Sequence, residues 1–277
     1  WLSEKTPSET TLAALNAKYG LDQPVYVQLF KYLGNLAHGD FGVSLKMQKN
    51  RPVLSIILEM FPVSAKIGAI ALAWAVLVGV PLGCLAAFKR GKMTDSILRV
   101  VCTLGISMPS FVVASVLLVT MAGGISGFKL FPTIFDASAG WRTYVLPCFS
   151  LGFYPMCYTA RQTRSAMLDS LNQEYIKTAR AKGLKNSKII FKHALRNALI
   201  PVMTVIGLGL GNLLGGMVLV ETIFKWPGVG QFAYESVMAA DYPAIIGVAL
   251  LIALNYMIIN TVVDILYGII DPRVRCS

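Results

Sequence analysis

Long apolar runs alternate with shorter polar segments along the chain. The runs do not show the period-two alternation of a membrane β-strand, and a helix needs about 20 apolar residues to cross the bilayer core. The pattern therefore predicts an all-α membrane protein with five transmembrane helices in this sequence. They are expected at residues 63–88, 98–122, 143–160, 197–220 and 245–270.

The first 62 residues lack such a run and are predicted to form an extramembrane segment. Residues Thr6–Glu9 form a capping box that begins a short helix, and Gly20 can end it. Apolar residues recur at helical spacing after Pro24, which predicts a second, amphipathic helix. Residues 63–277 then make up the transmembrane domain, with a long polar loop at about 165–196.

Charge gives the orientation. Only 14% of residues are charged, against about a quarter in soluble domains. Lys and Arg gather in residues 89–99, in residues 161–196 and in the C-terminal tail, whereas residues 123–142 and 221–244 hold three between them. Because positive loops stay in the cytoplasm, the long loop and the C-terminus are predicted to be cytoplasmic and residues 1–62 external.

The external placement of residues 1–62 requires something to carry them across the membrane. The sequence begins at Trp1, and we expect a further transmembrane helix upstream, giving six spans; a cleaved signal peptide is the alternative. The segment holds six Lys and Arg residues of its own, so the charge rule is not perfectly kept. The net charge of +11 is not accompanied by a nucleic-acid-reading motif, so no nucleic acid is expected as a partner.

The sequence offers little catalytic chemistry. His38 and His193 are the only histidines and fall on opposite sides of the membrane in this topology. No HExxH, GxSxG or phosphate-binding loop is present, and the five cysteines form no CxxC pair. We therefore expect no enzyme activity, no metal and no cofactor in this chain. If transport is driven by ATP, the ATPase is another chain.

The fourth predicted span carries a row of small residues. Gly207, Gly211 and Gly215 recur every four residues, with Asn212 beside them, and Asn255 is polar within the fifth span. Such residues are typical of a helix that lines a pathway or meets a second subunit. Ordinary helix packing within one subunit explains the same pattern equally well.

The most basic long segment is residues 172–201. Its positive residues are Lys177, Arg180, Lys182, Lys185, Lys188, Lys192 and Arg196. By charge alone, this segment is a solvated loop that is retained in the cytoplasm.

Specific motifs in and around this segment indicate a family. Residues 174–183 (EYIKTARAKG) and 193–197 (HALRN) resemble the "EAA" loop of binding-protein-dependent ABC import permeases, in particular the dipeptide/oligopeptide/nickel branch. The external residues 221–230 (ETIFKWPGVG) are similar to the same branch. So are the blocks DYP from Asp241, GLDQP from Gly20 and GDFG from Gly39. Aligned on Gly183, however, only Ala179 and Gly183 agree with the generic Glu-Ala-Ala…Gly pattern.

The resemblance implies a type I ABC importer permease subunit in a bacterial or archaeal plasma membrane, surrounded by lipid. Such a subunit carries peptides or a related small solute, such as a nickel chelate or a glutathione-like molecule, by alternating access. It pairs with a second, similar permease chain and two cytoplasmic ATPases that bind ATP and Mg²⁺. An extracytoplasmic binding protein delivers the substrate.

The resemblance also assigns residues to roles. Residues 174–182 are expected to form a short helix that docks on an ATPase and that Gly183 ends in the left-handed conformation. The residues implied in coupling are Glu174, Tyr175, Ala179, Arg180, Ala181, Gly183 and His193. Those of the external-loop motif are Glu221, Trp226, Pro227, Gly228 and Asp241. Residues 188–196 are expected to continue as helix into the fourth span.

Two other functions remain compatible with the residues. An ion-coupled secondary transporter would more typically show internal repeats and carboxylates within its spans, where this sequence has little beyond Asp264 near the end of the last span. A membrane scaffold would have less need for spans broken by proline and glycine. The substrate itself is not encoded in recognisable residues of this chain.

Overall fold

The computed structural model describes residues 23–123 and 130–270. Over these residues the chain is helical and contains no strand; Val43 and Pro52 form an isolated bridge. The helix predicted between Thr6 and Gly20 lies outside the described residues. The all-α class predicted from the hydrophobic pattern is confirmed.

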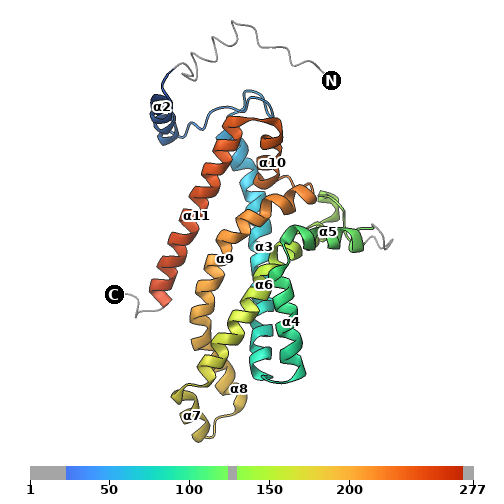
Figure 1. Cartoon of the computed structure of the whole chain (residues 1–277), viewed down its shortest axis with the longest axis vertical. Coiled ribbons are helices and arrows are strands. Elements are labelled where there is room, and N and C mark those ends of the chain that lie inside the picture. Colours follow the sequence, from blue (N-terminus) through green and yellow to red (C-terminus); the bar gives the residue numbers. More distant parts are fainter. Residues whose placement is uncertain (1–22, 124–129, 271–277) are drawn as a thin grey trace.

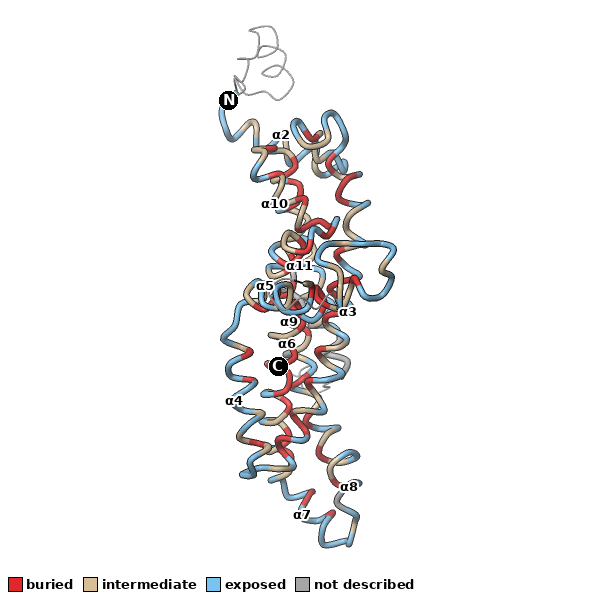
Figure 2. The backbone as a smooth tube through the Cα atoms, turned by 90° about the vertical axis from the view of Figure 1, so that its right-hand side faces the viewer, coloured by how far each residue is buried: buried red, intermediate tan, exposed pale blue. Residues whose placement is uncertain are grey.

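Four long helices form the body of the molecule (Figure 1): α3 (Val53–Phe88), α6 (Arg142–Leu171), α9 (Leu195–Ile223) and α11 (Tyr242–Ile270). Helix α6 lies at the centre, because it makes extensive contacts with both α3 and α9. A buried cluster joins these three helices and includes Ile67, Leu146, Leu213 and Trp226. In Figure 2 the buried positions follow the inner sides of the long helices.

Two helices in the described part of the chain are long and apolar enough to cross a membrane: α3, and α11 over Tyr242–Val263. Helices α4 (Met93–Ser107) and α5 (Ser110–Met121) pass the same test as a pair, but they meet at an angle of 104°. Helices α6 and α9 contain the other predicted spans. The number of five spans stays a prediction.

The sequence pattern predicted one continuous span over residues 98–122, and the structure shows a break in it at Met108 and Pro109. Met108 has φ −89° and ψ 122°, which is extended and not helical. A residue that precedes proline is disfavoured in the α conformation by contact with the proline ring. The proline therefore turns α5 away from α4, as Figure 1 shows.

Helix α3 begins ten residues before the predicted span, and Pro62 and Pro81 lie within it. At about 1.5 Å per residue its 36 residues measure about 54 Å, against about 30 Å for the bilayer core. The helix therefore extends well beyond the membrane, and the boundary drawn at residue 62 falls inside it. Helix α6 likewise continues to Leu171, past the predicted end at residue 160.

Short elements lie at the two ends of this body (Figure 1). One end carries α7 (Glu174–Ala181), α8 (Asn186–Lys188) and a π-helical turn, η2 (Ile189–Ala194). The other end carries α10 (Val229–Ala239) and α2 (Val25–Ala37), the amphipathic helix predicted after Pro24. A short 3-10 turn, η1 (Ala137–Ala139), precedes α6. None of the residues of α2 is buried.

Candidate functional site

The sequence motifs lie at opposite ends of the molecule. The basic loop with α7 and α8 is at one end, and the motifs around Gly39, Glu221 and Asp241 are at the other. Helix α9 connects the two ends, since it begins after η2 and ends at Ile223. The two ends are described in turn.

Helix α7 packs on the body of the chain through one face. Ile176 and Ala179 are buried and contact Met167, Ile189 and Ala194 in a small apolar cluster. Their spacing of three residues places them on one side of the helix. Ala179, one of the residues assigned to coupling, thus faces its own chain. The exposed face is formed by the other residues of α7 and its C-terminal end: Glu174, Tyr175, Lys177, Thr178, Arg180, Ala181, Lys182 and Gly183.

Gly183 ends α7 in the left-handed conformation, as predicted, with φ +74°. Its N–H donates to Arg180 O at 2.9 Å, and Leu184 N–H donates to Ala179 O at 3.3 Å. No atom lies within 4 Å of the Cβ that a larger residue would place here. The requirement for glycine within this chain is therefore conformational and not one of space.

The helix predicted to run from Lys188 into the fourth span is continuous but not α-helical throughout. Residues Ile189–Ala194 form the π-helical turn η2, and His193 lies half-buried within it. No local pattern in the sequence predicts this turn. π-Helical turns are rare and occur often at functional sites.

A hydroxyl pair fastens α7 to this turn. Ser170, near the end of α6, donates from Oγ to Ala194 O at 3.0 Å, and its Oγ lies 2.6 Å from the Tyr175 hydroxyl. Three elements (α6, α7 and η2) thus meet at one serine. Tyr175 belongs to a sequence motif, whereas Ser170 belongs to none and could not be identified from the sequence.

An ion pair closes the neighbouring turn between α3 and α4. The buried Asp95 carboxylate accepts from Arg164 Nε at 2.6 Å and from Arg164 Nη2 at 2.9 Å. It also accepts from the Gly91 N–H at 3.1 Å. The bidentate geometry ties the start of α4 to α6 close to the α7 end of the molecule.

At the opposite end, Glu221 caps helix α10. The Glu221 side chain is fully buried, and its Oε2 accepts from the backbone N–H groups of Gly230 at 2.8 Å and Gln231 at 3.1 Å. The N–H of Val229 donates to Ser64 Oγ on α3 at 2.9 Å. These bonds satisfy N–H groups that a helix start leaves without intrahelical partners. Ser64 was not identified from the sequence.

Gly228 is required by space. A Cβ at this position would lie 2.4 Å from Glu221 Oε2 and 2.4 Å from Ser64 Oγ. We expect Gly228→Ala to displace the cap and to destabilise the protein by about 1–3 kcal/mol, the usual cost of overpacking. The loss of stability is measured as a decrease in the thermal unfolding temperature in detergent.

Gly34→Ala is the control for Gly228→Ala, since no atom lies within 4 Å of a Cβ at Gly34 in the exposed helix α2. Alanine is the better helix former, so this variant should unfold at or slightly above the wild-type temperature. Equal unfolding temperatures for the two variants would show that the cap at Gly228 tolerates displacement.

Trp226 anchors the same loop in the core. Its indole is 1% exposed and meets the rings of Phe135 and Tyr144 edge-on, with ring centroids 4.7 Å and 5.0 Å apart. Its backbone N–H donates to Glu221 O at 2.8 Å. Pro227, which follows it, is exposed. The loop after α9 is therefore part of the packed interior.

Asp241 joins the loop before α11 to the N-terminal segment. Its buried carboxylate accepts from Ser44 Oγ at 2.6 Å and from the N–H groups of Leu45, Lys46 and Met47 at 3.0–3.1 Å. Burial by itself raises the pKa of Asp241. The hydrogen bonds from Ser44 and from these N–H groups outweigh burial, so the pKa lies below its ordinary value.

The GDFG block from Gly39 and the DYP block from Asp241, which are about 200 residues apart in the sequence, thus come together. A Cβ at Gly42, in the GDFG block, would lie 3.7 Å from Pro243 Cβ, next to Asp241. Gly42 O also accepts from the Val53 N–H at the start of α3. The motifs around Gly39, Glu221 and Asp241 are structural neighbours and build one fixed cap over the ends of α3, α10 and α11.

The glycine row of α9 does not form one uniform surface. Gly207 is buried, and a Cβ there would lie 2.4 Å from Val263 Cγ1, so Gly207 permits close packing of α9 against α11. No atom lies within 4 Å of a Cβ at Gly215. Gly211 and Asn212 lie on α9, but their surroundings are outside the described part.

Asn255 borders a cavity. Its Nδ2 donates to Leu251 O at 2.9 Å within α11, and its side chain lines a space of about 210 Å³ between α3, α9 and α11. Ser64 and Met217 line the same space. The structure therefore places Asn255 at a cavity, and it places Gly207 at a helix contact.

Comparison with known proteins gives the family. Residues 79–275 match the family described as "Binding-protein-dependent transport system inner membrane component". The chain is 38% identical to the probable D,D-dipeptide transport system permease protein DdpB of Escherichia coli K12, over 96% of this chain and 85% of that protein. It is 39% identical to the di/tripeptide transport system permease protein DppB of Pseudomonas aeruginosa UCBPP-PA14, over 93% and 83%. It is 38% identical to the glutathione transport system permease protein GsiC of Salmonella paratyphi A, over 95% and 84%.

Solved structures share the fold. A chain of the inward-facing MetNI methionine ABC transporter aligns with a TM-score of 0.64 and 16% identity, over 79% of this chain and 97% of that chain. A chain of an amino acid ABC transporter crystallised with histidines aligns with a TM-score of 0.61 and 13% identity, over 77% and 93%. The helical arrangement, the motifs at both ends and these matches agree, and the chain belongs to the family of binding-protein-dependent transport system inner membrane components.

Proposed function

We propose that this chain is the permease subunit of an ATP-driven importer that carries short peptides or a related small solute, such as glutathione or a chelated metal. The observation that carries the proposal is the exposed helix α7, which is joined through η2 directly to the long helix α9. The similarity to permeases named for dipeptide, di/tripeptide and glutathione transport supports the substrate class.

Three kinds of partner, four chains in all, complete the proposal. A second, similar permease chain forms the other half of the pathway, and two ATPases bind ATP and Mg²⁺ on the α7 side. A binding protein delivers the substrate on the side of α10. The family description, which names a binding-protein-dependent transport system, supports such an assembly.

The α7 end is proposed to be cytoplasmic. The basic residues of the 89–99 connection and of the 161–196 segment gather at this end, which is the arrangement that the positive-inside rule favours. The cap around Glu221 and Asp241 then faces the binding protein.

Coupling is proposed to act through α7. The exposed residues Arg180 and Ala181 contact an ATPase, while Ile176 and Ala179 hold the helix on the body of the chain. When the ATPases close, α7 moves, and the bonds of Ser170 to Tyr175 and Ala194 pass that movement to η2 and α9. Asn255 is a candidate pathway position. So are the glycines of α9 at which a Cβ would meet no other atom, such as Gly215.

Reconstitution tests the function. The chain is placed in vesicles with the permease, ATPase and binding-protein chains of the same transport system, and uptake of labelled dipeptide, tripeptide and glutathione is measured. We expect uptake that requires both ATP and the binding protein. Uptake driven by an ion gradient without ATP would indicate a secondary transporter. Failure of all three substrates with active ATPases would exclude the proposed substrate class.

A further inference from the structure

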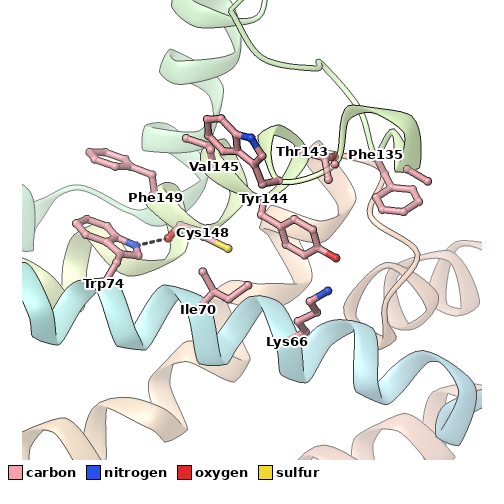
Figure 3. Close-up of a pocket in the computed structure, with 12 residues that line it drawn as sticks. Lys66, Ile70, Trp74, Phe135, Thr143, Tyr144, Val145, Cys148 and Phe149 are labelled. Atoms are coloured by element: carbon pink, nitrogen blue, oxygen red, sulfur yellow. Dashed lines mark hydrogen bonds between the residues drawn. The ribbon is translucent and has the colours of Figure 1, made fainter.

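A large aromatic cavity opens between α3 and α6, next to the Trp226 anchor, because Phe135 and Tyr144 line the cavity and also contact Trp226. It has a volume of about 830 Å³, within the range of small-molecule sites. Figure 3 shows Lys66, Ile70 and Trp74 of α3 facing Tyr144, Cys148 and Phe149 of α6 across it. Its wall is therefore built by two of the long helices of the membrane domain.

The deeper wall is apolar and its polar groups are satisfied. The rings of Trp74 and Phe149 stack with centroids 5.0 Å apart and planes 10° apart. The Trp74 indole N–H donates to Cys148 O at 2.7 Å, the dashed line in Figure 3. This bond removes a donor and an acceptor from the cavity, which leaves a surface suited to a hydrocarbon chain.

The depth of the cavity in the membrane follows from α3. Lys66 lies 23 residues before Lys89, the residue that follows α3 at its basic end, which is about 35 Å along the helix at about 1.5 Å per residue. The bilayer core is about 30 Å thick, so Lys66 lies at headgroup level on the face opposite the basic loop. Trp74 lies eight residues, or about 12 Å, deeper, at the level of the acyl chains.

Trp141 indicates that this end of the cavity lies at the membrane interface, as Lys66 does. Trp141 precedes α6, lines the cavity and is 70% exposed. Tryptophan is enriched at membrane interfaces, where its ring meets both apolar chains and polar headgroups. The cavity thus runs from the interface into the hydrocarbon.

The positive charge of Lys66 favours an anionic ligand in this cavity. Among the described residues that line the cavity, Lys66 carries the single charge, and no carboxylate lies with it. The ammonium group lies 4.7 Å from the centroid of the Tyr144 ring, at the end of the cavity away from Trp74 (Figure 3). A lysine at this level attracts an anionic headgroup by about 1 kcal/mol.

We propose that this cavity is a binding site for an anionic phospholipid. The phosphate contacts Lys66, and one acyl chain lies along Ile70, Trp74 and Phe149. With the orientation proposed above, the lipid belongs to the external leaflet. It holds α3 and α6 together beneath the cap.

Native mass spectrometry of the transporter complex in nanodiscs tests the site. The nanodiscs contain equal amounts of phosphatidylglycerol and phosphatidylcholine with the same acyl chains. The wild type should retain phosphatidylglycerol preferentially, and Lys66→Ala should lower this preference about fivefold, the factor that corresponds to about 1 kcal/mol. Lys66→Arg should keep it. Lys31→Ala, an exposed lysine of α2, is the matched control and should behave as wild type.

A second measurement identifies the occupant directly. A photo-reactive phenylalanine at Val145, which lines the cavity, should cross-link to lipid. Val145→Trp should fill the space and reduce retention of both lipids. Equal lipid preference in wild type and Lys66→Ala would overturn the proposal. So would cross-linking of position 145 to a protein chain, which would show that a helix occupies the cavity.

Discussion

Arg180→Glu should lower ATP-driven uptake by tenfold or more without unfolding the protein. Arg180 is exposed on α7, beyond the face that Ile176 and Ala179 bury, so the reversal leaves the packing of the helix intact. A charged residue at the centre of a protein interface commonly contributes 2 kcal/mol or more, which corresponds to about a 30-fold change in affinity. Initial uptake rates in vesicles and the amount of ATPase that co-purifies measure the effect.

Lys92→Glu is the matched control for Arg180→Glu. Lys92 is an exposed basic residue in the turn between α3 and α4, at the same end of the molecule but outside the EAA-like loop. If α7 is the docking element, only Arg180→Glu should lose uptake and ATPase. Equal losses in both variants would show that general positive charge at this end, and not α7, holds the ATPases.

Asp241→Ala should destabilise the cap around Glu221 and Asp241 by about 3–5 kcal/mol. The substitution leaves the buried Ser44 hydroxyl and the partly buried N–H groups of Lys46 and Met47 without their acceptor. Removing one partner from a buried, charged set of hydrogen bonds costs this much because the remaining groups lose both water and partner. Thermal unfolding and protease cleavage within residues 44–50 report the loss.

Glu59→Gln is the comparison for Asp241→Ala. Glu59 pairs with Arg51 at an exposed position near the same end, and such a surface pair contributes at most about 1 kcal/mol. Similar effects of the two variants would show that the cap does not depend on Asp241.

Acid should reproduce the effect of Asp241→Ala. Since the pKa of Asp241 is lowered in the folded protein, its stabilisation is complete above the unfolded value of about 3.9 and is lost as the pH falls through the folded value. Asp241→Ala should lack this part of the acid sensitivity.

The sequence predicted the all-helical class and the apolar stretches better than the limits and bends of the helices. Hydropathy located the apolar stretches of α3 and α11, because a membrane helix must be apolar over its whole circumference. It could not show that α3 begins at Val53, since the helix there is outside the bilayer and is held by tertiary contacts. Pro109 was visible in the sequence, but the angle of 104° that it introduces depends on how α5 packs.

The sequence predicted some residues of the candidate site and missed their partners, for a similar reason. The resemblance identified Glu221, Asp241 and Gly228, and the left-handed Gly183 followed from a local rule of helix ends. The partners Ser44, Ser64 and Ser170 were missed, because serine is common and their acceptors or donors are distant in sequence. Sequence patterns report local geometry, and these contacts are not local.

The bond between Ser44 and Asp241 also bears on how the protein is made. Its two residues are separated by 197 positions, and Asp241 directly precedes the final helix. At about 5–20 residues per second, a ribosome needs roughly 10–40 s to synthesise the intervening chain. The turn at residues 44–47 therefore lacks its acceptor until α9 and α10 have been made. Closing the cap is one of the last steps of assembly, and it links completion of the surface at that end to insertion of the whole chain.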